Sequence, residues 1–229
     1  MAAAALTASD LPYFRPMEQR DERPRPAAGQ SQSPADEAAA AAAAEDVALM
    51  LRVREGDMGA FEKLVERHQS AVIGTVAKML GDVDEAHDIA QQVFVRVWKS
   101  APRYEPKAKF TTWLFTITRN LVFNEMRRAS RRYQVSMDER EEEHHLQTPS
   151  GAPTPDSAAK QSEFEAAIDK AIESLPNKAR MAVVLRRYED MPYDEIGKVL
   201  KLSIPAVKSL LFRARTQLRD ALSDYLDGE

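Results

Sequence analysis

The most chemically distinctive residues of the chain lie in one amphipathic stretch near its C-terminus. Apolar side chains recur there at three- and four-residue steps, at Val207, Leu210, Leu211, Ala214, Leu218 and Leu222. The side chains that fall mostly outside this stripe are Lys208, Ser209, Phe212, Arg213 and Arg215. Arginine reads guanine edges with two hydrogen bonds, lysine and serine hold phosphates, and an aromatic ring contacts a thymine methyl group. The pattern predicts a DNA-binding helix, although a solvated amphipathic helix would show the same spacing.

A second stretch, residues 103–132, combines positive charge with aromatic rings. It contains eight arginine and lysine residues against two glutamates. Its rings include Tyr104, Phe110, Trp113 and Phe115. Basic side chains that follow phosphates, together with rings that stack on unpaired bases, are what single-stranded nucleic acid requires. The stretch predicts such a site, with the alternative that Trp113 and Phe115 are core residues. The loop 105–110, just before a predicted helix, could hold a flipped base.

A third stretch, residues 82–94, is acidic and rich in amides. Acidic residues in a first helical turn compensate the helix dipole, which would explain Asp84 without any partner. Asp88, Gln91 and Gln92 continue beyond that turn. Their position predicts a polar face that docks on another protein.

Catalytic and metal sites are not expected. The chain has no Cys and only 4 His, and it lacks the P-loop, GxSxG, HExxH and dinucleotide fingerprints. We therefore predict no catalytic residue, no metal or other cofactor, no small-molecule substrate and no enzymatic activity. No apolar run approaches the roughly 18 residues that cross a bilayer, and the N-terminus does not resemble a signal peptide. These features predict a cytoplasmic protein without membrane insertion.

The hydrophobic pattern predicts an all-α chain, because no stretch alternates with a period of two. Gly56 and Asp57 are typical of a helix end followed by a new N-cap, and the helix that follows should end at Gly81. Asp84 is predicted to cap the next helix, which Pro102 should end. A third long helix is predicted to begin near Thr111 or Thr112 and to run toward Arg128.

The C-terminal part predicts a helix-turn-helix. Two short helices, residues 193–200 and 204 to about 225, are separated by only three residues. Ser203 is a favourable N-cap, and Pro205 falls in the first turn, where its missing N–H costs least. In this motif the first helix braces the second, which enters the major groove.

Composition divides the chain into four parts. Residues 1–46 are predicted to form a disordered N-terminal extension, because proline and charge dominate its first 37 residues. Residues 47–133 form a helical block with 15 basic and 10 acidic side chains, and residues 164–229 form the second helical domain. Residues 134–163, which include Glu141–Glu143 and several prolines, are predicted to be a flexible acidic linker. This charge pattern favours a nucleic-acid partner for the two blocks.

Five segments together resemble the extracytoplasmic-function (ECF) sigma factors, group IV of the sigma-70 family. They are GDMGAFEKLVERHQSAV, GDVDEAHDIAQQVFVRVW, RYEPKAKFTTWLFTITRNLVFNEMRR, ESLPNKARMAVVLRRYEDMPYDEIGKVL and SIPAVKSLLFRAR. The resemblance spans roughly 150 of the 229 residues, in the expected order. It implies a region 2-like helical bundle at 47–133 and a region 4-like helix-turn-helix domain at 164–229, joined by the linker. The partners it implies are core RNA polymerase, promoter DNA and, in many members of the family, an anti-sigma factor.

The resemblance also assigns roles to residues. Region 2 would dock on the polymerase through Asp84, Asp88, Gln91, Gln92, Phe94 and Trp98. It would read and open the minus-10 element through Lys107, Lys109, Phe110, Thr111, Thr112, Trp113, Arg119, Asn120, Arg127 and Arg128. Region 4 would read the minus-35 duplex through Lys208, Ser209, Phe212, Arg213 and Arg215.

The chain departs from the family pattern at three positions, and two other classes of protein remain open. Pro205 stands where the family usually has Gly, Leu210 where it often has Arg, and Pro192 where a Ser commonly caps the brace helix. One alternative is a helix-turn-helix regulator that binds operator DNA without polymerase. The other is a helical adaptor that binds no nucleic acid.

Overall fold

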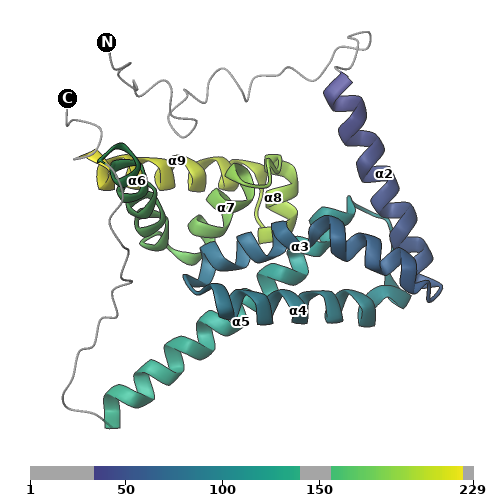
Figure 1. Ribbon diagram of the computed structural model, residues 1–229, viewed down its shortest axis with the longest axis horizontal. Helices are drawn as coiled ribbons and strands as arrows, with labels where there is room; N and C mark the ends of the chain where they lie inside the picture. Colours follow the sequence, from purple (N-terminus) through teal and green to yellow (C-terminus); the bar gives the residue numbers. More distant parts are fainter. Residues whose placement is uncertain (1–33, 140–155, 224–229) are drawn as a thin grey trace.

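The computed structural model describes residues 34–139 and 156–223, and every regular element within these ranges is helical. The first group of helices is α2 (Pro34–Arg54), α3 (Met58–Leu80), α4 (Val83–Ser100) and α5 (Phe110–Glu139), with a short 3₁₀ turn at Ala101–Arg103. The second group is α6 (Asp156–Glu173), α7 (Asn177–Arg187), α8 (Tyr193–Leu200) and α9 (Ile204–Ala221). Figure 1 shows the second group lying over α3 and the first part of α5. The all-α prediction is confirmed for the described residues.

Local signals in the sequence set several helix boundaries. Asp57 caps α3 by accepting a hydrogen bond from the backbone N–H of Ala60 at 3.0 Å. Gly81 ends that helix in the left-handed conformation, with φ 77°, which glycine adopts without steric cost. Ser203 caps α9, and Pro205 lies in its first turn. These boundaries agree with the predictions.

Two predicted boundaries in the first group are corrected. The N-cap of α4 is Asp82 and not Asp84, because one oxygen of Asp82 accepts the N–H groups of both Asp84 and Glu85, at 2.8 and 3.0 Å. α5 begins at Phe110, ahead of Thr111 and Thr112. The Phe110 ring is only 1% exposed, so its packing in the core fixes the start of the helix.

The described helices also extend into segments that were predicted to lack structure. Residues 34–46 belong to α2, which explains the alanine-rich run as part of a helix. Pro34 is tolerated at the first helical position, and Asp36 and Glu37 lie in the first turn, where acidic side chains are favourable. α5 continues to Glu139 and α6 starts at Asp156, so both helices reach into the predicted linker. The rest of the predicted extension and linker, residues 1–33 and 140–155, lies outside the described residues.

A buried polar cluster ties α2 to α3. Asp46 is 4% exposed, and its two carboxylate oxygens contact His68 Nε2 at 2.9 Å and Arg67 Nη1 at 2.7 Å. Burial raises the pKa of Asp46, but the hydrogen bonds with His68 and Arg67 outweigh burial and hold that pKa below its usual value. The cluster therefore holds a negative charge inside the first group of helices.

A seam of polar contacts joins the two groups of helices. Lys78 Nζ lies 2.7 Å from a carboxylate oxygen of Asp169, and Arg180 donates to the backbone oxygen of Met79 at 2.7 Å. Thr75 donates to Glu189 at 3.2 Å, and burial raises the pKa of that glutamate. The second half of α5 extends away from both groups (Figure 1). Among the described residues, no helix is long and apolar enough to cross a membrane.

Candidate nucleic-acid interface

The pair α8–α9 has the geometry of a helix-turn-helix. Lys201 ends α8 in the left-handed conformation with φ 56°, and Ser203, two residues later, is the N-cap of α9. The buried stripe of α9 consists of Val207, Leu211, Ala214 and Leu218. No side chain caps α8, because Pro192 occupies the N-cap position. The departure noted at Pro192 therefore leaves the brace helix without a capping hydroxyl.

The opposite face of α9 presents the predicted minus-35 residues to solvent. Phe212 is 66% exposed, which is unusual for a phenylalanine, and Lys208, Ser209 and Arg213 are exposed beside it. Arg213 Nε donates to the backbone oxygen of Ser209 at 3.3 Å, which holds the guanidinium close to the helix. Arg215 is half-buried and donates to the oxygen of Leu211 at 3.2 Å. The first four residues thus share one exposed face, while Arg215 lies at its edge.

The predicted minus-10 residues before α5 and in its first turn are divided between solvent and core. Lys107 is exposed and pairs with Glu105. Lys109 extends from the same loop to Glu195 of α8, with its Nζ 2.7 Å from a carboxylate oxygen. The hydroxyl of Thr112, which is 3% exposed, donates to the other oxygen of Glu195 at 3.1 Å. The start of α5 is therefore engaged by a side chain of the second group.

A cluster of aromatic rings supports this loop from inside. The Phe110 ring lies 5.2 Å from the His68 ring and 6.1 Å from the Trp113 ring, and Tyr104 lies 5.1 Å from Trp113. Tyr104 is 2% exposed, and its hydroxyl has no hydrogen-bond partner among the described residues. Burial raises the pKa of that hydroxyl. Among the four rings at positions 104, 110, 113 and 115, only Trp113 keeps a partly exposed surface.

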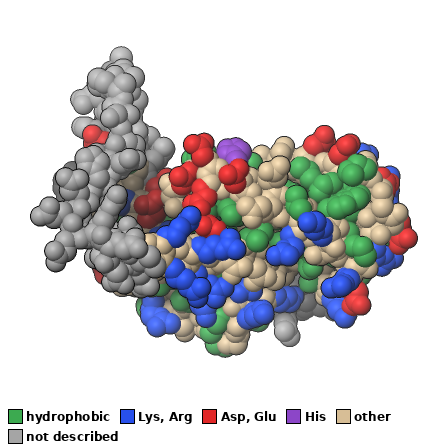
Figure 2. Space-filling view, turned by 90° about the horizontal axis from the view of Figure 1, so that it is seen from below, with side chains coloured by type: hydrophobic (Ala, Val, Ile, Leu, Met, Phe, Trp, Pro, Cys, Tyr) green, Lys and Arg blue, Asp and Glu red, His purple; other side chains and the backbone are tan. Residues whose placement is uncertain are grey.

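The middle of α5 carries the remaining predicted minus-10 residues. Asn120, Arg127 and Arg128 are exposed, and Arg128 and Arg132 both contact the carboxylate of Glu125. Arg119 is half-buried, and two of its guanidinium nitrogens have no hydrogen-bond partner among the described residues. Burial lowers the pKa of this arginine. Figure 2, which views the molecule from below, shows Lys and Arg side chains gathered on one part of that side and hydrophobic side chains gathered on another.

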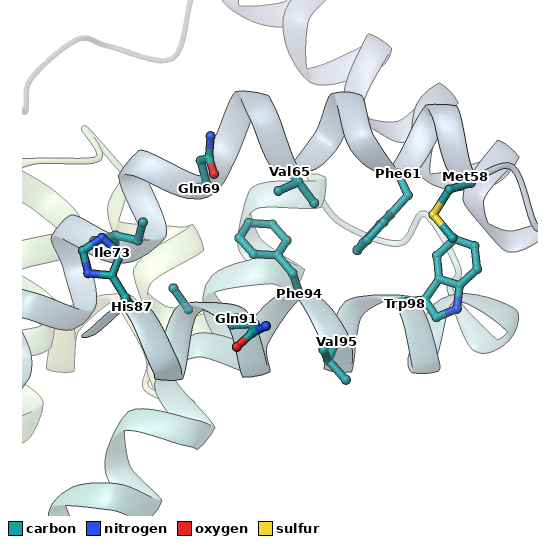
Figure 3. A pocket seen from close by; sticks show the side chains of 11 residues that line it. Met58, Phe61, Val65, Gln69, Ile73, His87, Gln91, Phe94, Val95 and Trp98 are labelled. Atoms are coloured by element: carbon teal, nitrogen blue, oxygen red, sulfur yellow. The ribbon is translucent and has the colours of Figure 1, made fainter. Parts of the chain in front are cut away.

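An apolar groove lies between α3 and α4 on the first group of helices. It has a volume of about 520 Å³ and is lined from α3 by Met58, Phe61, Val65, Gln69 and Ile73 and from α4 by His87, Ala90, Gln91, Phe94, Val95 and Trp98. Phe61 and Trp98 face each other at one end, with ring centroids 5.1 Å apart (Figure 3). Met58 and Val95 are 53% and 47% exposed, which is costly for apolar side chains without a partner.

The predicted polymerase-docking residues lie on and beside this groove. Asp84, Asp88, Gln91 and Gln92 are exposed on α4. Phe94 is 7% exposed and Trp98 is half-buried, and both line the groove with Gln91. The docking set therefore has a polar part along α4 and an apolar part between two helices. The sequence prediction did not include the α3 residues that line the groove. One signal was present, because the apolar residue Val95 lies among polar residues on the exposed face of α4 and so suggests an apolar contact there.

Glu195 was also absent from the predicted sites, and the sequence offered no signal for it. A glutamate in the first turn of a helix is favourable by itself, so its type and position demand no partner. Its contacts with Lys109 and Thr112 join residues more than eighty positions apart. Within the ranges that the structure describes, no three His, Cys, Asp or Glu side chains are grouped as metal ligands would be.

Comparisons with known proteins give the same order of domains along the chain. Residues 64–132 match the family described as Sigma-70 region 2, and residues 165–218 match Sigma-70, region 4. The RNA polymerase sigma-H factor of Pseudomonas aeruginosa is 30% identical over 188 residues, which are 80% of this chain and 96% of the relative. The ECF RNA polymerase sigma factor SigW of Bacillus subtilis is 30% identical over 176 residues, 76% of this chain and 94% of the relative.

A solved structure shares the fold. It is the sigma factor RpoE of Bartonella quintana in complex with the anti-sigma factor NepR, with a TM-score of 0.56 and 24% identity. The match covers 71% of this chain and 96% of the other. It supports the helical architecture of both groups.

Proposed function

The chain belongs to the ECF RNA polymerase sigma factors, and from this premise we propose how its surfaces share the work of starting transcription. As a sigma factor it directs transcription together with core RNA polymerase and promoter DNA. Sigma factors are initiation factors, so this chain supplies binding and no chemical step. RNA synthesis belongs to the polymerase. The compartment that we propose for it is the cytoplasm, where a bacterial promoter and its polymerase meet.

The minus-35 element is assigned to the exposed face of α9. Phe212 and Arg213 project from a helix whose other face is buried, so they can approach base edges in the major groove. Lys208 and Ser209 lie beside them and are suited to hold the phosphate backbone. Arg215 is assigned a supporting phosphate contact at the edge of this face.

The minus-10 element is assigned to the start and middle of α5. Lys107, Lys109 and the threonines 111 and 112 surround the N-terminus of the helix, where backbone N–H groups favour an anion. Trp113 is the ring available to stack on an unpaired base, since Phe110 is buried beneath it. Stacking contributes about 1–3 kcal/mol per base, which offsets the few kcal/mol that extrusion of a base costs. Arg119, Asn120, Arg127 and Arg128 extend this surface along the helix.

Core polymerase is assigned to α4 and the groove beside it. We expect the partner to be a polymerase helix with polar side chains along one edge and apolar side chains along the other. The polar edge would contact Asp84, Asp88, Gln91 and Gln92. The apolar edge would fill the groove beside Phe94 and Trp98. Burying the exposed surfaces of Met58 and Val95 gives this contact a hydrophobic driving force.

The observation that supports the proposal is that two separately matched domains, in one chain and in this order, contain the two sets of side chains that we assign to nucleic acid. We propose their extents as residues 47–133 and 164–229, with the acidic residues 134–163 between them. A regulator that binds duplex DNA alone needs only the second domain. The first domain, with its aromatic loop and its groove, is what we assign to the opened strand and to the polymerase.

Run-off transcription tests the proposal. Purified bacterial core polymerase is mixed with a pool of randomised promoters, with and without this protein, and the transcripts are sequenced. We expect protein-dependent transcripts that share two upstream motifs at a fixed spacing. The doubly substituted variant Asp88→Ala/Gln92→Ala should lose transcripts and polymerase binding, whereas the matched variant Glu66→Ala/Gln217→Ala, exposed elsewhere, should keep both. Tight binding to duplex DNA without polymerase, and no transcripts with it, would instead establish a stand-alone regulator.

A further inference from the structure

The contact between α5 and α8 places one carboxylate on two side chains that are assigned to promoter DNA. Glu195 is 7% exposed, and its two oxygens are used separately. One lies 2.7 Å from Lys109 Nζ and the other accepts the Thr112 hydroxyl at 3.1 Å. Lys109 immediately precedes α5 and Thr112 is its third residue, so the carboxylate is held at the N-terminal end of a 30-residue helix.

Lys109, Thr112 and the N-terminus of α5 form an anion-binding site, and the Glu195 carboxylate occupies it. Lysine ammonium groups, threonine hydroxyls and helix N-termini are the groups with which proteins hold phosphates. A carboxylate and a phosphate diester each present negative oxygens to such donors, so the same two side chains suit either. The site can hold one of them at a time, because both would require the same Lys109 and Thr112 donors.

We propose that Glu195 is an internal latch, which occupies a phosphate site of the minus-10 surface whenever α8 packs on α5. This inference rests on the proposed function for the identity of the competing ligand, a phosphate of the single DNA strand. Binding of that strand at Lys109 and Thr112 and packing of α8 on α5 then exclude each other. The two helical groups must separate at this point before the strand is held there.

Two other contacts of the seam are suited to opening, whereas the hydrogen bond from Arg180 to the Met79 oxygen, at 2.7 Å, has to break. The pair of Lys78 and Asp169 is partly covered, with side chains 27% and 53% exposed, and an ion pair that water reaches contributes only modestly to stability. The bond from Thr75 reaches a glutamate whose pKa is raised by burial, so exposure of Glu189 to water relieves a cost. Glu195 is likewise hydrated once the seam opens, and its charge then needs no protein partner.

The latch leaves the minus-35 surface accessible. Lys208, Ser209 and Phe212 are exposed while Glu195 is bound, because they lie on the face of α9 that points away from its buried stripe. Closure should therefore weaken binding of single-stranded DNA and leave binding of duplex DNA nearly unchanged. The contrast between single-stranded and duplex DNA therefore distinguishes a latch from a change in the net charge of the protein, which would alter binding of both.

The substitution Glu195→Gln tests the latch on the free, full-length protein. It keeps the shape of the side chain and replaces charge-assisted hydrogen bonds with neutral ones, which are roughly half as strong. The matched control is Asp194→Asn, which removes the same charge from the preceding position of α8, where the carboxylate contacts Lys198 at 3.4 Å and is 51% exposed. The probe is a fluorescent single-stranded DNA of mixed sequence, about 12 nucleotides long, and the same sequence as a duplex.

We expect Glu195→Gln to raise the affinity for the single strand about fivefold and to leave the affinity for the duplex within about twofold. Asp194→Asn should change neither. An equal gain for both probes would show that charge alone acts, and no gain for the single strand would overturn the latch. If Glu195→Gln does not fold, Asp169→Asn weakens the seam far from either DNA surface and should produce a smaller gain of the same kind.

Domain separation gives a readout that does not depend on DNA. The chain has no cysteine, so Ser70→Cys on α3 and Gln217→Cys on α9 create two exposed labelling sites for energy transfer. Energy transfer should fall in Glu195→Gln and remain unchanged in Asp194→Asn. Unchanged transfer in Glu195→Gln would overturn the latch, whereas absence of transcripts with wild-type protein and core polymerase would overturn the proposed function instead.

Discussion

The two surfaces assigned to DNA use the same kinds of side chain but hold them differently. On α9, Phe212 is 66% exposed and Lys208 and Arg213 stand beside it in solvent. At the start of α5, Phe110 is 1% exposed and Thr112 is 3% exposed and bonded to Glu195. The α9 surface can bind a ligand without a change of structure. At the start of α5, Phe110 belongs to the core and Thr112 is already bound by Glu195.

The difference suits the two ligands that we propose for these surfaces. Duplex DNA presents its base edges in the major groove without distortion, so a rigid exposed helix is sufficient to read them. A single strand must have its bases unstacked, and the site that holds them needs firm walls beneath the exposed ring. Phe110, Tyr104 and His68 supply such walls below Trp113. Phe110 therefore contributes through packing, whereas Phe212 contributes through its exposed surface.

The largest effect should come from removing the aromatic ring at each surface in turn. Phe110→Ala leaves a cavity in the core and should lower the free energy of unfolding by about 3–5 kcal/mol. Phe212→Ala removes an exposed ring and should change it by less than about 0.5 kcal/mol. Urea unfolding followed by circular dichroism measures both. Similar losses for the two variants would remove the distinction between the surfaces.

The next effect concerns the buried charge behind the α5 surface. Asp46 bonds His68, and the His68 ring packs on Phe110, so Asp46→Asn should destabilise the protein by about 1.5–3 kcal/mol at pH 7. Burial raises the pKa of Asp46, yet His68 and Arg67 together lower it below its usual 3.8. The stability that Asp46 contributes is therefore fully present above pH 3.8 and is lost as pH falls below that value.

The difference in stability between wild type and Asp46→Asn should consequently shrink as pH falls below 3.8. Denaturant unfolding at a series of pH values measures it. Glu37→Gln is the matched control, because this acid is exposed in the first turn of α2, where interaction with the helix dipole contributes at most about 1 kcal/mol. A gap between Asp46→Asn and wild type that stays constant through acid pH would contradict the assigned cause.

How far the sequence predicted the structure depends on whether the cause was local. Asp57 and Ser203 accept N–H groups three residues further on, and the N–H of Gly81 donates to the Ala77 oxygen four residues back, so these helix boundaries followed from the sequence. The N-cap of α4 was wrong by two residues because Asp82, Asp84 and Glu85 are all suitable at a helix start. The exposed face of α9 also followed from spacing within one helix. The contacts of Lys109 and Thr112 could not be predicted from the sequence, because they are made with Glu195 in the other group of helices.

The α9 surface makes a prediction about sequence preference. Arg213→Ala should cost about 1–3 kcal/mol on promoters that carry one particular base at one minus-35 position and little on the others. The measurement is transcription from a library that varies each minus-35 base. Arg219→Ala is the matched control, since this arginine is exposed near the end of the same helix. Equal losses on all promoters for Arg213→Ala would make it a phosphate contact.

The smallest effect should appear at the exposed half of α5. Arg128 is 74% exposed and makes a long contact to Glu125, at 3.5 Å, so its charge is accessible to a phosphate. Removing one phosphate contact lowers the slope of log affinity against log salt by about 0.7 for a single strand. Between 50 and 200 mM salt this corresponds to a difference of about threefold in affinity. Arg128→Ala should show this reduced salt dependence, and Lys99→Ala on α4 should not.

The same measurement in a Glu195→Gln background tests how far the latch reaches. Because Arg128 lies far along the helix from Glu195, Arg128→Ala should reduce the slope equally in the wild-type and the Glu195→Gln protein. A reduction seen only in the Glu195→Gln protein would mean that the latch covers α5 beyond its first turn.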